Sequence, residues 1–416
     1  MSELITNYAK NTVGPVMYRY TRWVLERAKK KGIKRLYFLA RDGYLLCEIA
    51  KILCKKYGYD IEVRYLYCSR ASLRMPSYHI ISEEEMYKIL LLGGYYLTPK
   101  SVLLRAGLSI SERKELYGEL GVDEPDRCLG ESEFNALCEK IKASEKYKSL
   151  VLERSRQAYL PLIDYLKEEG LFEGDTVALV DSGWTGSMQR SLRQLLSSAG
   201  YRGKMVGFYF GMYVTPNDAD DGEYLTFYFD RRTGLRRKAL FNNNLFECML
   251  SAPHAMTLCY RYGENGVVPV LADGMDEKML SLVREQIKGA LEYAESITVD
   301  TRKYSYKRER RVCFKILKRI MTRPTREEAE MLSAFTFCDD VTEGYSLSLA
   351  NGEMKKSLKK YMLIHRIIRK LRGRKQDGEA ELFWPYGVVA FCRPILRPWY
   401  RLNISAWQWL KYMLGK

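Results

Sequence analysis

Two segments of the chain share one pattern: a short apolar run, a turn that contains glycine, and then a helical pattern. The first is LYFLARDGYLLCEIAKIL at 36–53, and the second is TVALVDSGWTGSMQRSLRQLLSSAG at 176–200. Each segment is followed by another strand-like run, at 63–67 and at 205–212. They therefore predict two strand–helix–strand units, which cross over in the right-handed sense and build a parallel sheet.

The rest of the chain shows mainly helical patterns. An amphipathic helix is predicted at 14–31. Residues 72–170 have helical patterns broken by turn-rich stretches, which predicts a helical subdomain inserted into an α/β domain formed by 1–71 and 171–260. A mainly helical, strongly charged C-terminal region is expected at 261–416. The expected fold class is α/β, with a parallel sheet flanked by helices in the Rossmann manner.

Composition narrows the class of partner. The ten cysteines are scattered without a C-x-x-C pair, and the first residues lack the apolar core of a signal peptide. Reduced thiols and a cytoplasmic location are therefore expected. No apolar run reaches the roughly 18 residues that a membrane span requires. The formal net charge of +17 favours an anionic partner, a class that includes phosphorylated substrates, nucleic acid and an anionic membrane surface.

The two turns, at 40–43 and 181–187, are the candidate ligand sites. In open parallel sheets, ligands bind outside the carboxyl ends of the strands, where both turns are expected. The second turn runs directly into a helix, whose N-terminal N–H groups and dipole favour a phosphate. Asp181, at the expected strand end, would direct a carboxylate to the same place. Either turn alone could be structural, because Asp and Gly are ordinary turn residues.

The second segment resembles the phosphoribosyl-pyrophosphate-binding segment of the type I phosphoribosyltransferase family. Both have four apolar residues, an acidic end, a short Thr-Gly-Ser loop and a helix. The first segment resembles that family's first strand and pyrophosphate loop, with Asp42 in place of a glycine. The family usually has two adjacent acidic residues where this chain has Asp181 and Ser182. The resemblance implies phosphoribosyl pyrophosphate as the donor and Mg²⁺ as the cofactor.

The resemblance also implies a role for each matching residue. Asp181 would hold the ribose hydroxyls and the metal ion, beside Ser182 and Gly183. The 5-phosphate would lie against the loop and the start of the helix, at Thr185, Gly186, Ser187 and Met188. The pyrophosphate would lie against Arg41, Asp42 and Gly43. Arg70 would act as a clamp, because its planar fork suits phosphate oxygens, although alone it is as well explained as a solvated surface arginine.

The pattern FLARDGYLL … YCSR … VDSGWTGS also resembles proteins of bacterial surface-polysaccharide gene clusters that are often identified as haloacid-dehalogenase-like hydrolases. Those hydrolases need an Asp-x-Asp pair, but Ala40 occupies the nucleophile position and only Asp42 remains. Ser69 would supply their second-motif hydroxyl. The resemblance implies polysaccharide ribofuranosylation: transfer of 5-phosphoribosyl to a hydroxyl of a lipid-linked glycan, with a separate phosphatase that removes the phosphate.

Three residues are candidates for the general base: Asp42, Glu247 and His254, in that order. Glu247 and His254 stand among apolar residues in NNNLFECMLSAPHAMTLCY at 242–260, where burial would shift their pKa values. The alternative is a core helix with satisfied polar groups. His79 and His365 lack metal-ligand spacing with another His or Cys, so no zinc site is predicted.

The C-terminal part combines basic and aromatic residues. The basic run at 355–375 has apolar residues at helical spacing, and the following stretch mixes Arg and Lys with four tryptophans: Trp384, Trp399, Trp407 and Trp409. Such mixtures are typical of interfacial helices on anionic lipid. The interpretation is peripheral attachment of 355–416 to the inner membrane face. Nucleic acid is not expected, because no recognised binding module accompanies the run. Packing of this part on the sheet domain stays an alternative.

Three functions therefore stay open. The first is a Mg²⁺-dependent phosphoribosyltransferase, that is, a pentosyltransferase acting on a surface glycan. The second is a haloacid-dehalogenase-like phosphatase acting on a sugar phosphate, with Asp42 as its remaining acid. The third is a non-catalytic scaffold that recruits other enzymes to the membrane.

Overall fold

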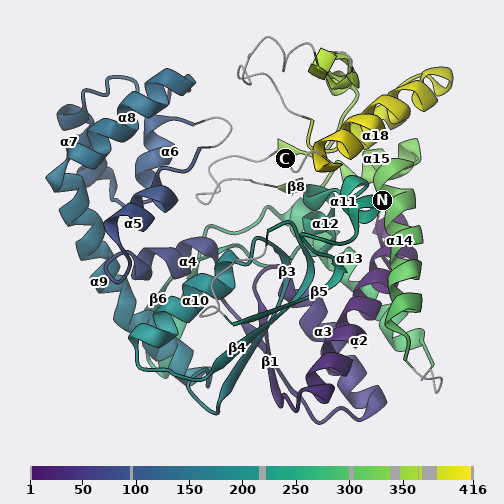
Figure 1. Cartoon of the computed structure of the whole chain (residues 1–416), viewed down its shortest axis with the longest axis horizontal. Helices are drawn as coiled ribbons and strands as arrows, with labels where there is room; N and C mark the ends of the chain where they lie inside the picture. The colour runs from purple at the N-terminus through teal and green to yellow at the C-terminus, as the bar shows by residue number, and fades with distance from the viewer. Residues whose placement is uncertain are drawn as a thin grey trace.

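A five-stranded, fully parallel sheet forms the centre of the molecule (Figure 1). The computed structural model describes residues 2–93, 97–214, 222–298, 304–337, 347–363, 365–367 and 382–413. The strand order is β2-β1-β3-β4-β5. The strands span Arg35–Leu39 (β1), Glu62–Leu66 (β2), Thr176–Trp184 (β3), Lys204–Met212 (β4) and Glu223–Phe229 (β5).

Both faces of the sheet are covered, which explains the buried apolar runs in its central strands, such as 36–39 in β1 and 177–180 in β3. On one face, Phe38 and Val180 pack with helices α2 (Gly14–Lys30) and α3 (Gly43–Tyr57). On the other face, Tyr37 and Leu179 pack with helices α9 (Glu145–Glu168) and α10 (Ser187–Ser198). The α/β fold with a parallel, Rossmann-like sheet was therefore predicted correctly.

The described residues between β2 and α9 form helices, as the pattern at 72–170 predicts. They are α4 (Arg70–Arg74), the short 3-10 helix η2 (Met75–Ser77), α5 (Glu83–Leu90), α6 (Pro99–Leu104), α7 (Ile110–Leu120) and α8 (Glu131–Ala143). Helices α5 to α8 gather at one side of the molecule (Figure 1). They share an apolar core with the first half of α9, separate from both layers beside the sheet.

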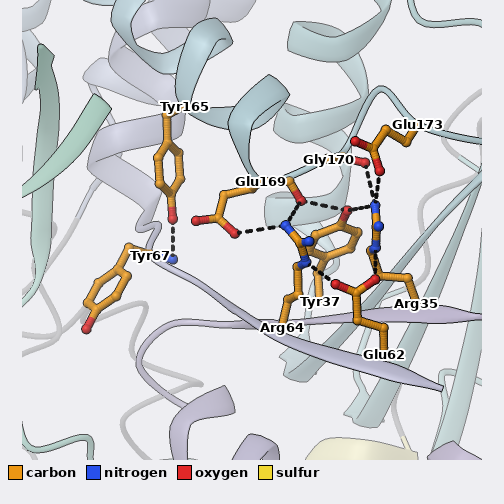
Figure 2. Close-up of polar contacts among 9 residues, drawn as sticks. All are labelled: Arg35, Tyr37, Glu62, Arg64, Tyr67, Tyr165, Glu169, Gly170 and Glu173. Carbon is orange, nitrogen blue, oxygen red and sulfur yellow. Dashed lines mark hydrogen bonds and ion pairs between the residues drawn. The ribbon is translucent and has the colours of Figure 1, made fainter. Parts of the chain in front are cut away.

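A network of charged groups fixes the end of α9 to the first two strands (Figure 2). Arg35 donates to Glu62 at 2.5 Å, to the Gly170 carbonyl at 3.1 Å and to Glu173 at 2.7 Å. Arg64 donates to the Glu169 carbonyl at 2.9 Å. Arg35 and Glu62 are the first residues of their parallel strands. The network therefore lies at the end of β1 opposite the glycine turn, and its role is structural.

The region at 261–416 is mainly helical, as predicted, but it begins within a β-hairpin that the prediction did not include. Strands β6 (Thr257–Gly263) and β7 (Gly266–Leu271) pair in the antiparallel sense. The ring of Tyr260 stacks on Tyr165 of α9, with 4.6 Å between the centroids. The sequence carries a hairpin signal that the prediction missed: strand-forming residues on both sides of Gly-Glu-Asn-Gly.

After the hairpin, helices α13 (Glu277–Ser296) and α14 (Tyr306–Thr322) pack against α2. The rest comprises α15 (Arg326–Leu332), the short pair β8 (Thr336–Phe337) and β9 (Leu347–Ser348), the 3-10 helix η4 (Glu353–Tyr361), α17 (Pro385–Ala390), the 3-10 turn η5 (Pro394–Leu396) and α18 (Arg397–Met413). Much of the basic run at 355–375 lies outside the described residues. Within the described ranges, no helix combines the length and the apolar character that crossing a bilayer requires.

Trp384 does not belong to an interfacial aromatic group, contrary to the prediction. Its side chain is fully buried, and its indole N–H donates to the carbonyl of Met321 at 2.9 Å. Of the four C-terminal tryptophans, Trp399 is the one with more than half of its surface exposed. The sequence pattern could not separate these cases, because an aromatic residue suits a core as well as a membrane surface.

Candidate active site

The two glycine turns meet at the carboxyl ends of β1 and β3. These strands are neighbours in the sheet, and the chain proceeds from them in opposite directions, to β2 on one side and to β4 on the other. In open α/β sheets this reversal point is where ligands bind. A hydrogen bond joins the first turn to the end of β3, from the hydroxyl of Ser182 to the carboxylate of Asp42.

The first turn depends on Gly43. This residue begins α3, and a Cβ atom there would lie 2.7 Å from the carbonyl carbon of Phe38 in β1. Glycine therefore lets the helix start unusually close to the strand. Asp42 precedes the helix but its side chain does not cap it. Its carboxylate instead accepts the bond from Ser182.

The second turn is shorter than predicted, because β3 continues to Trp184. Gly183 and Trp184 still pair with Gly211 and Met212 of β4, so Asp181 lies within the strand and not at its end. Gly183 has φ 117°, and a Cβ there would lie 2.2 Å from the Gly211 carbonyl oxygen. The turn itself consists of Thr185 and Gly186, and α10 begins at Ser187, which the prediction had placed in the turn.

Trp184 is a residue that sequence analysis missed. It has φ 74°, a left-handed conformation that is rare for a bulky residue and marks functional sites when the surroundings impose it. Its ring packs against Phe241, with 5.3 Å between the centroids. Its indole N–H donates to Oε1 of Glu247 at 2.7 Å. Trp184 therefore links the end of β3 to helix α12 (Asn243–Met249).

Three carboxyl groups converge at these elements: Asp42, Asp181 and Glu247. Each of the three residues is partly buried, so a part of its side chain can be reached by solvent. Burial raises the pKa of Asp42 above its ordinary value, and the Ser182 hydrogen bond opposes this shift. Burial, and then the neighbouring charge of Asp42, raise the pKa of Asp181 to about 8 and that of Glu247 to about 7.

Cations lie beside the carboxyl groups. Arg41 and Arg70 both lower the pKa of Asp42 and that of Glu247, although less than burial raises them. Arg70 is exposed at the start of α4, immediately after β2. Arg74, one helical turn further, has its pKa lowered by burial and then by Arg70. Sequence analysis missed Arg74, although its spacing of four from Arg70 predicts a shared helix face.

Ser69 is engaged with the backbone. Its hydroxyl accepts from the N–H of Ser72 at 3.0 Å, which caps α4, and donates to the carbonyl of Thr257 at 2.6 Å. The residue therefore holds the start of α4, and with it Arg70, against the first strand of the hairpin.

His254 lies in a cluster of tyrosines. Its ring centroid is 5.0 Å from that of Tyr67 and 5.7 Å from that of Tyr65. Nε2 is 2.6 Å from the Tyr65 hydroxyl, and Nδ1 is 2.8 Å from the carbonyl of Ala255. Burial lowers the pKa of His254, so the ring is neutral at pH 7. Both of its nitrogens have protein partners.

Among the described residues, no group of three or more His, Cys, Asp or Glu side chains is arranged to hold a metal ion. A Mg²⁺ ion that arrives with a phosphorylated substrate needs less, because one or two carboxylates and the phosphate oxygens hold it. Asp181 could be one such carboxylate. Burial raises its pKa, and a cation beside it would lower that pKa again by stabilising the charged form.

Comparison with models of known protein families gives no match, and comparison with curated protein sequences gives none either. The function must therefore be inferred from the chemistry of the site.

Proposed function

We propose that the protein is a phosphoribosyltransferase, which moves a 5-phosphoribosyl group from phosphoribosyl pyrophosphate to a hydroxyl of a bacterial surface glycan. One observation carries the proposal: two glycine turns meet at the reversal point of the sheet, where the Ser182–Asp42 hydrogen bond joins the first turn to the end of β3, with carboxylates and arginines side by side. A sugar pyrophosphate needs both kinds of group, because its hydroxyls require acceptors and its phosphates require donors.

The donor would lie across both turns. Asp181 would accept bonds from the ribose hydroxyls. The 5-phosphate would bind the turn and the first N–H groups of α10, at Thr185, Gly186, Ser187 and Met188. The pyrophosphate would lie along the first turn between Arg41 and Arg70. Mg²⁺, held by Asp181 and by the donor's own oxygens, would supply neutralising charge for the departing pyrophosphate.

The reaction breaks the bond between the anomeric carbon and the pyrophosphate oxygen and forms a bond from that carbon to the acceptor oxygen. Pyrophosphate leaves with the electron pair, and the acceptor proton goes to a protein base. Glu247 is the best candidate for that base, because a pKa of about 7 suits proton transfer at neutral pH. His254 has a partner on each nitrogen. Asp42 and Glu247 each accept one side-chain hydrogen bond, from Ser182 and from Trp184, so the pKa of Glu247 is what favours it over Asp42.

The two alternatives explain less. A haloacid-dehalogenase-like phosphatase would need a nucleophile at Ala40, which has no nucleophilic atom. Three adjacent acids with raised pKa values lower the stability of the fold at neutral pH, because burial disfavours their charged forms. A non-catalytic scaffold would have no use for such a cluster, whereas an active site would. We further propose a cytoplasmic location at the inner membrane face, near a lipid-linked glycan, and a separate phosphatase that acts on the product.

Calorimetric titration of Mg²⁺ and phosphoribosyl pyrophosphate into the protein tests the proposal. Binding in the micromolar range should be lost in Asp181→Asn and kept in Asp60→Asn, which removes an exposed carboxylate paired with Lys34. Absence of binding to the unaltered protein would exclude the transferase. Release of phosphate from sugar phosphates, without pyrophosphate release, would support the phosphatase instead.

A further inference from the structure

A cavity of about 810 Å³ lies in the C-terminal region, away from the residues of the proposed donor site. Its walls come from helices α14, α17 and α18 and from α11 (Leu235–Ala239), a short helix that packs on α18. Figure 1 shows α18 as the yellow helix at the outer edge of the molecule. Nothing in the proposed transfer reaction uses this cavity.

The cavity is lined by cations. Four basic side chains contribute to its wall: Arg236, Lys318, Arg323 and Arg401. No acidic residue is among the described residues that line it. Four positive charges without a carboxylate repel one another, and an anion between them would remove that repulsion.

Arg401 shows the strongest sign of a missing partner. Its Nε atom is buried and forms no hydrogen bond within the described part of the chain. Burial lowers the pKa of this guanidinium, and the charges of Arg323 and Arg397 lower it further. A buried guanidinium N–H without an acceptor is costly, and a phosphate oxygen is an acceptor that suits its planar fork.

An apolar surface begins at the rim of the same cavity. Leu402 lines the cavity, yet 64% of its surface is exposed. On the neighbouring turns of α18 and η5, Trp399 is 55% exposed and Ile395 is 85% exposed. Exposed apolar groups next to basic ones are typical of surfaces that contact lipid. Tyr386 and Trp409 add aromatic surface to the cavity wall.

We propose that the cavity binds the phosphate or pyrophosphate head of an amphiphile, whose apolar chain lies over Ile395, Trp399 and Leu402. The four cations match the charge of one or two phosphoryl groups. The adjoining apolar surface favours an amphiphile over a free phosphate, since a free ion would leave that surface in water. This site gives the proposed membrane attachment a specific ligand, and it stands whether or not the transferase activity is found.

Sedimentation of the full-length protein with lipid vesicles tests the proposal. Binding to phosphatidylcholine vesicles that contain phosphatidic acid should exceed binding to phosphatidylcholine alone by about tenfold or more. The double variant Arg323→Gln/Arg401→Gln should lose that excess. Arg326→Gln, which removes an exposed arginine paired with Glu330 on α15, should keep it. Unchanged binding of the double variant to phosphatidic acid would overturn the proposal.

A second arm separates the two sources of phosphate. Inorganic pyrophosphate should compete with vesicles for the unaltered protein. Trp399→Ser/Leu402→Ser should lose vesicle binding and keep the share of pyrophosphate binding that Arg323→Gln/Arg401→Gln removes, since both variants leave the proposed donor site unaltered. Two outcomes would exclude an amphiphile as the ligand. One is that Trp399→Ser/Leu402→Ser keeps vesicle binding; the other is that the unaltered protein binds pyrophosphate but no vesicles. Thermal unfolding of each variant serves as the folding check, and Lys318→Gln replaces the double variant if that variant does not fold.

Discussion

The hydroxyl of Ser182 donates a hydrogen bond to the carboxylate of Asp42, a residue 140 positions earlier in the chain. Asp42 belongs to the glycine turn after β1, and Ser182 lies near the carboxyl end of the neighbouring strand β3, just before the second turn. The bond therefore fixes the relative position of the two segments from which the proposed donor site is built.

Removal of this bond should have a pH-dependent cost. In Ser182→Ala, the pKa of Asp42 should rise further, because the hydroxyl lowers it in the unaltered protein. The lost stability should be about 1–3 kcal/mol at pH 8, where the carboxylate is charged and lacks its donor, and smaller at pH 5. Urea unfolding at both pH values measures this. Ser198→Ala, which removes a hydroxyl bonded to the Leu195 carbonyl, should give a loss independent of pH.

The elements around this bond could be predicted because their signals are local. The apolar runs before the two turns predicted β1 and β3, and the strand-like runs at 63–67 and 205–212 predicted β2 and β4. The amphipathic patterns predicted α2, α3 and α10. Strand β5 was not predicted, although its sequence EYLTFYF is rich in strand-forming aromatic residues. Local patterns do not tell which edge of a sheet receives another strand.

The candidate site was predictable only in part. Asp42, Asp181 and Glu247 were all selected from the sequence, but their mutual effect on pKa depends on three elements meeting in space. The positive φ of Trp184 and its bond to Glu247 leave no trace in a single sequence. The engagement of both nitrogens of His254 likewise depends on tertiary contacts with Tyr65 and the backbone.

Asp181→Asn should stabilise the protein at alkaline pH. The folded-state pKa of Asp181 is raised to about 8. The folded protein therefore holds the Asp181 proton more tightly than the unfolded chain, and this stabilises the fold at low pH. The stabilisation is lost as the pH rises from the ordinary pKa of an aspartate towards 8. Asparagine does not titrate. The gain of the variant over the unaltered protein should therefore grow by about 1–3 kcal/mol between pH 5 and pH 9.

Urea unfolding at the two pH values measures this difference. Asp60→Asn is the control, because the pKa of the exposed Asp60 is lowered by Lys34 and its charge does not change between pH 5 and pH 9. An equal effect of Asp181→Asn at both pH values would show that Asp181 titrates normally.

Trp184→Phe should move the pH profile of the proposed transferase reaction to higher pH. The indole N–H lowers the pKa of Glu247, so its loss leaves a smaller fraction of the base ionised at neutral pH. Pyrophosphate release should fall by about 3–10-fold at pH 6–7 and recover towards pH 9. Trp384→Phe is the matched control, since its buried indole bonds the backbone of Met321 and should affect stability alone. A uniform loss across the pH range would argue against Glu247 as the base.

Gly43→Ala should disturb the first turn through its backbone. A Cβ at this position would lie 2.7 Å from the carbonyl carbon of Phe38, so α3 would have to move away from β1. We expect a loss of about 1–3 kcal/mol in the free energy of unfolding, as for other overpacked sites. Gly118→Ala in α7 is the matched control, because its Cβ would meet no atom within 4 Å. That variant should gain about 0.5–1 kcal/mol, since alanine favours the helix.

Because Gly43 adjoins Asp42, its substitution should also weaken the binding of phosphoribosyl pyrophosphate, whereas Gly118→Ala should leave that binding unchanged. Equal stability of the two variants would mean that α3 does not need to start so close to the strand.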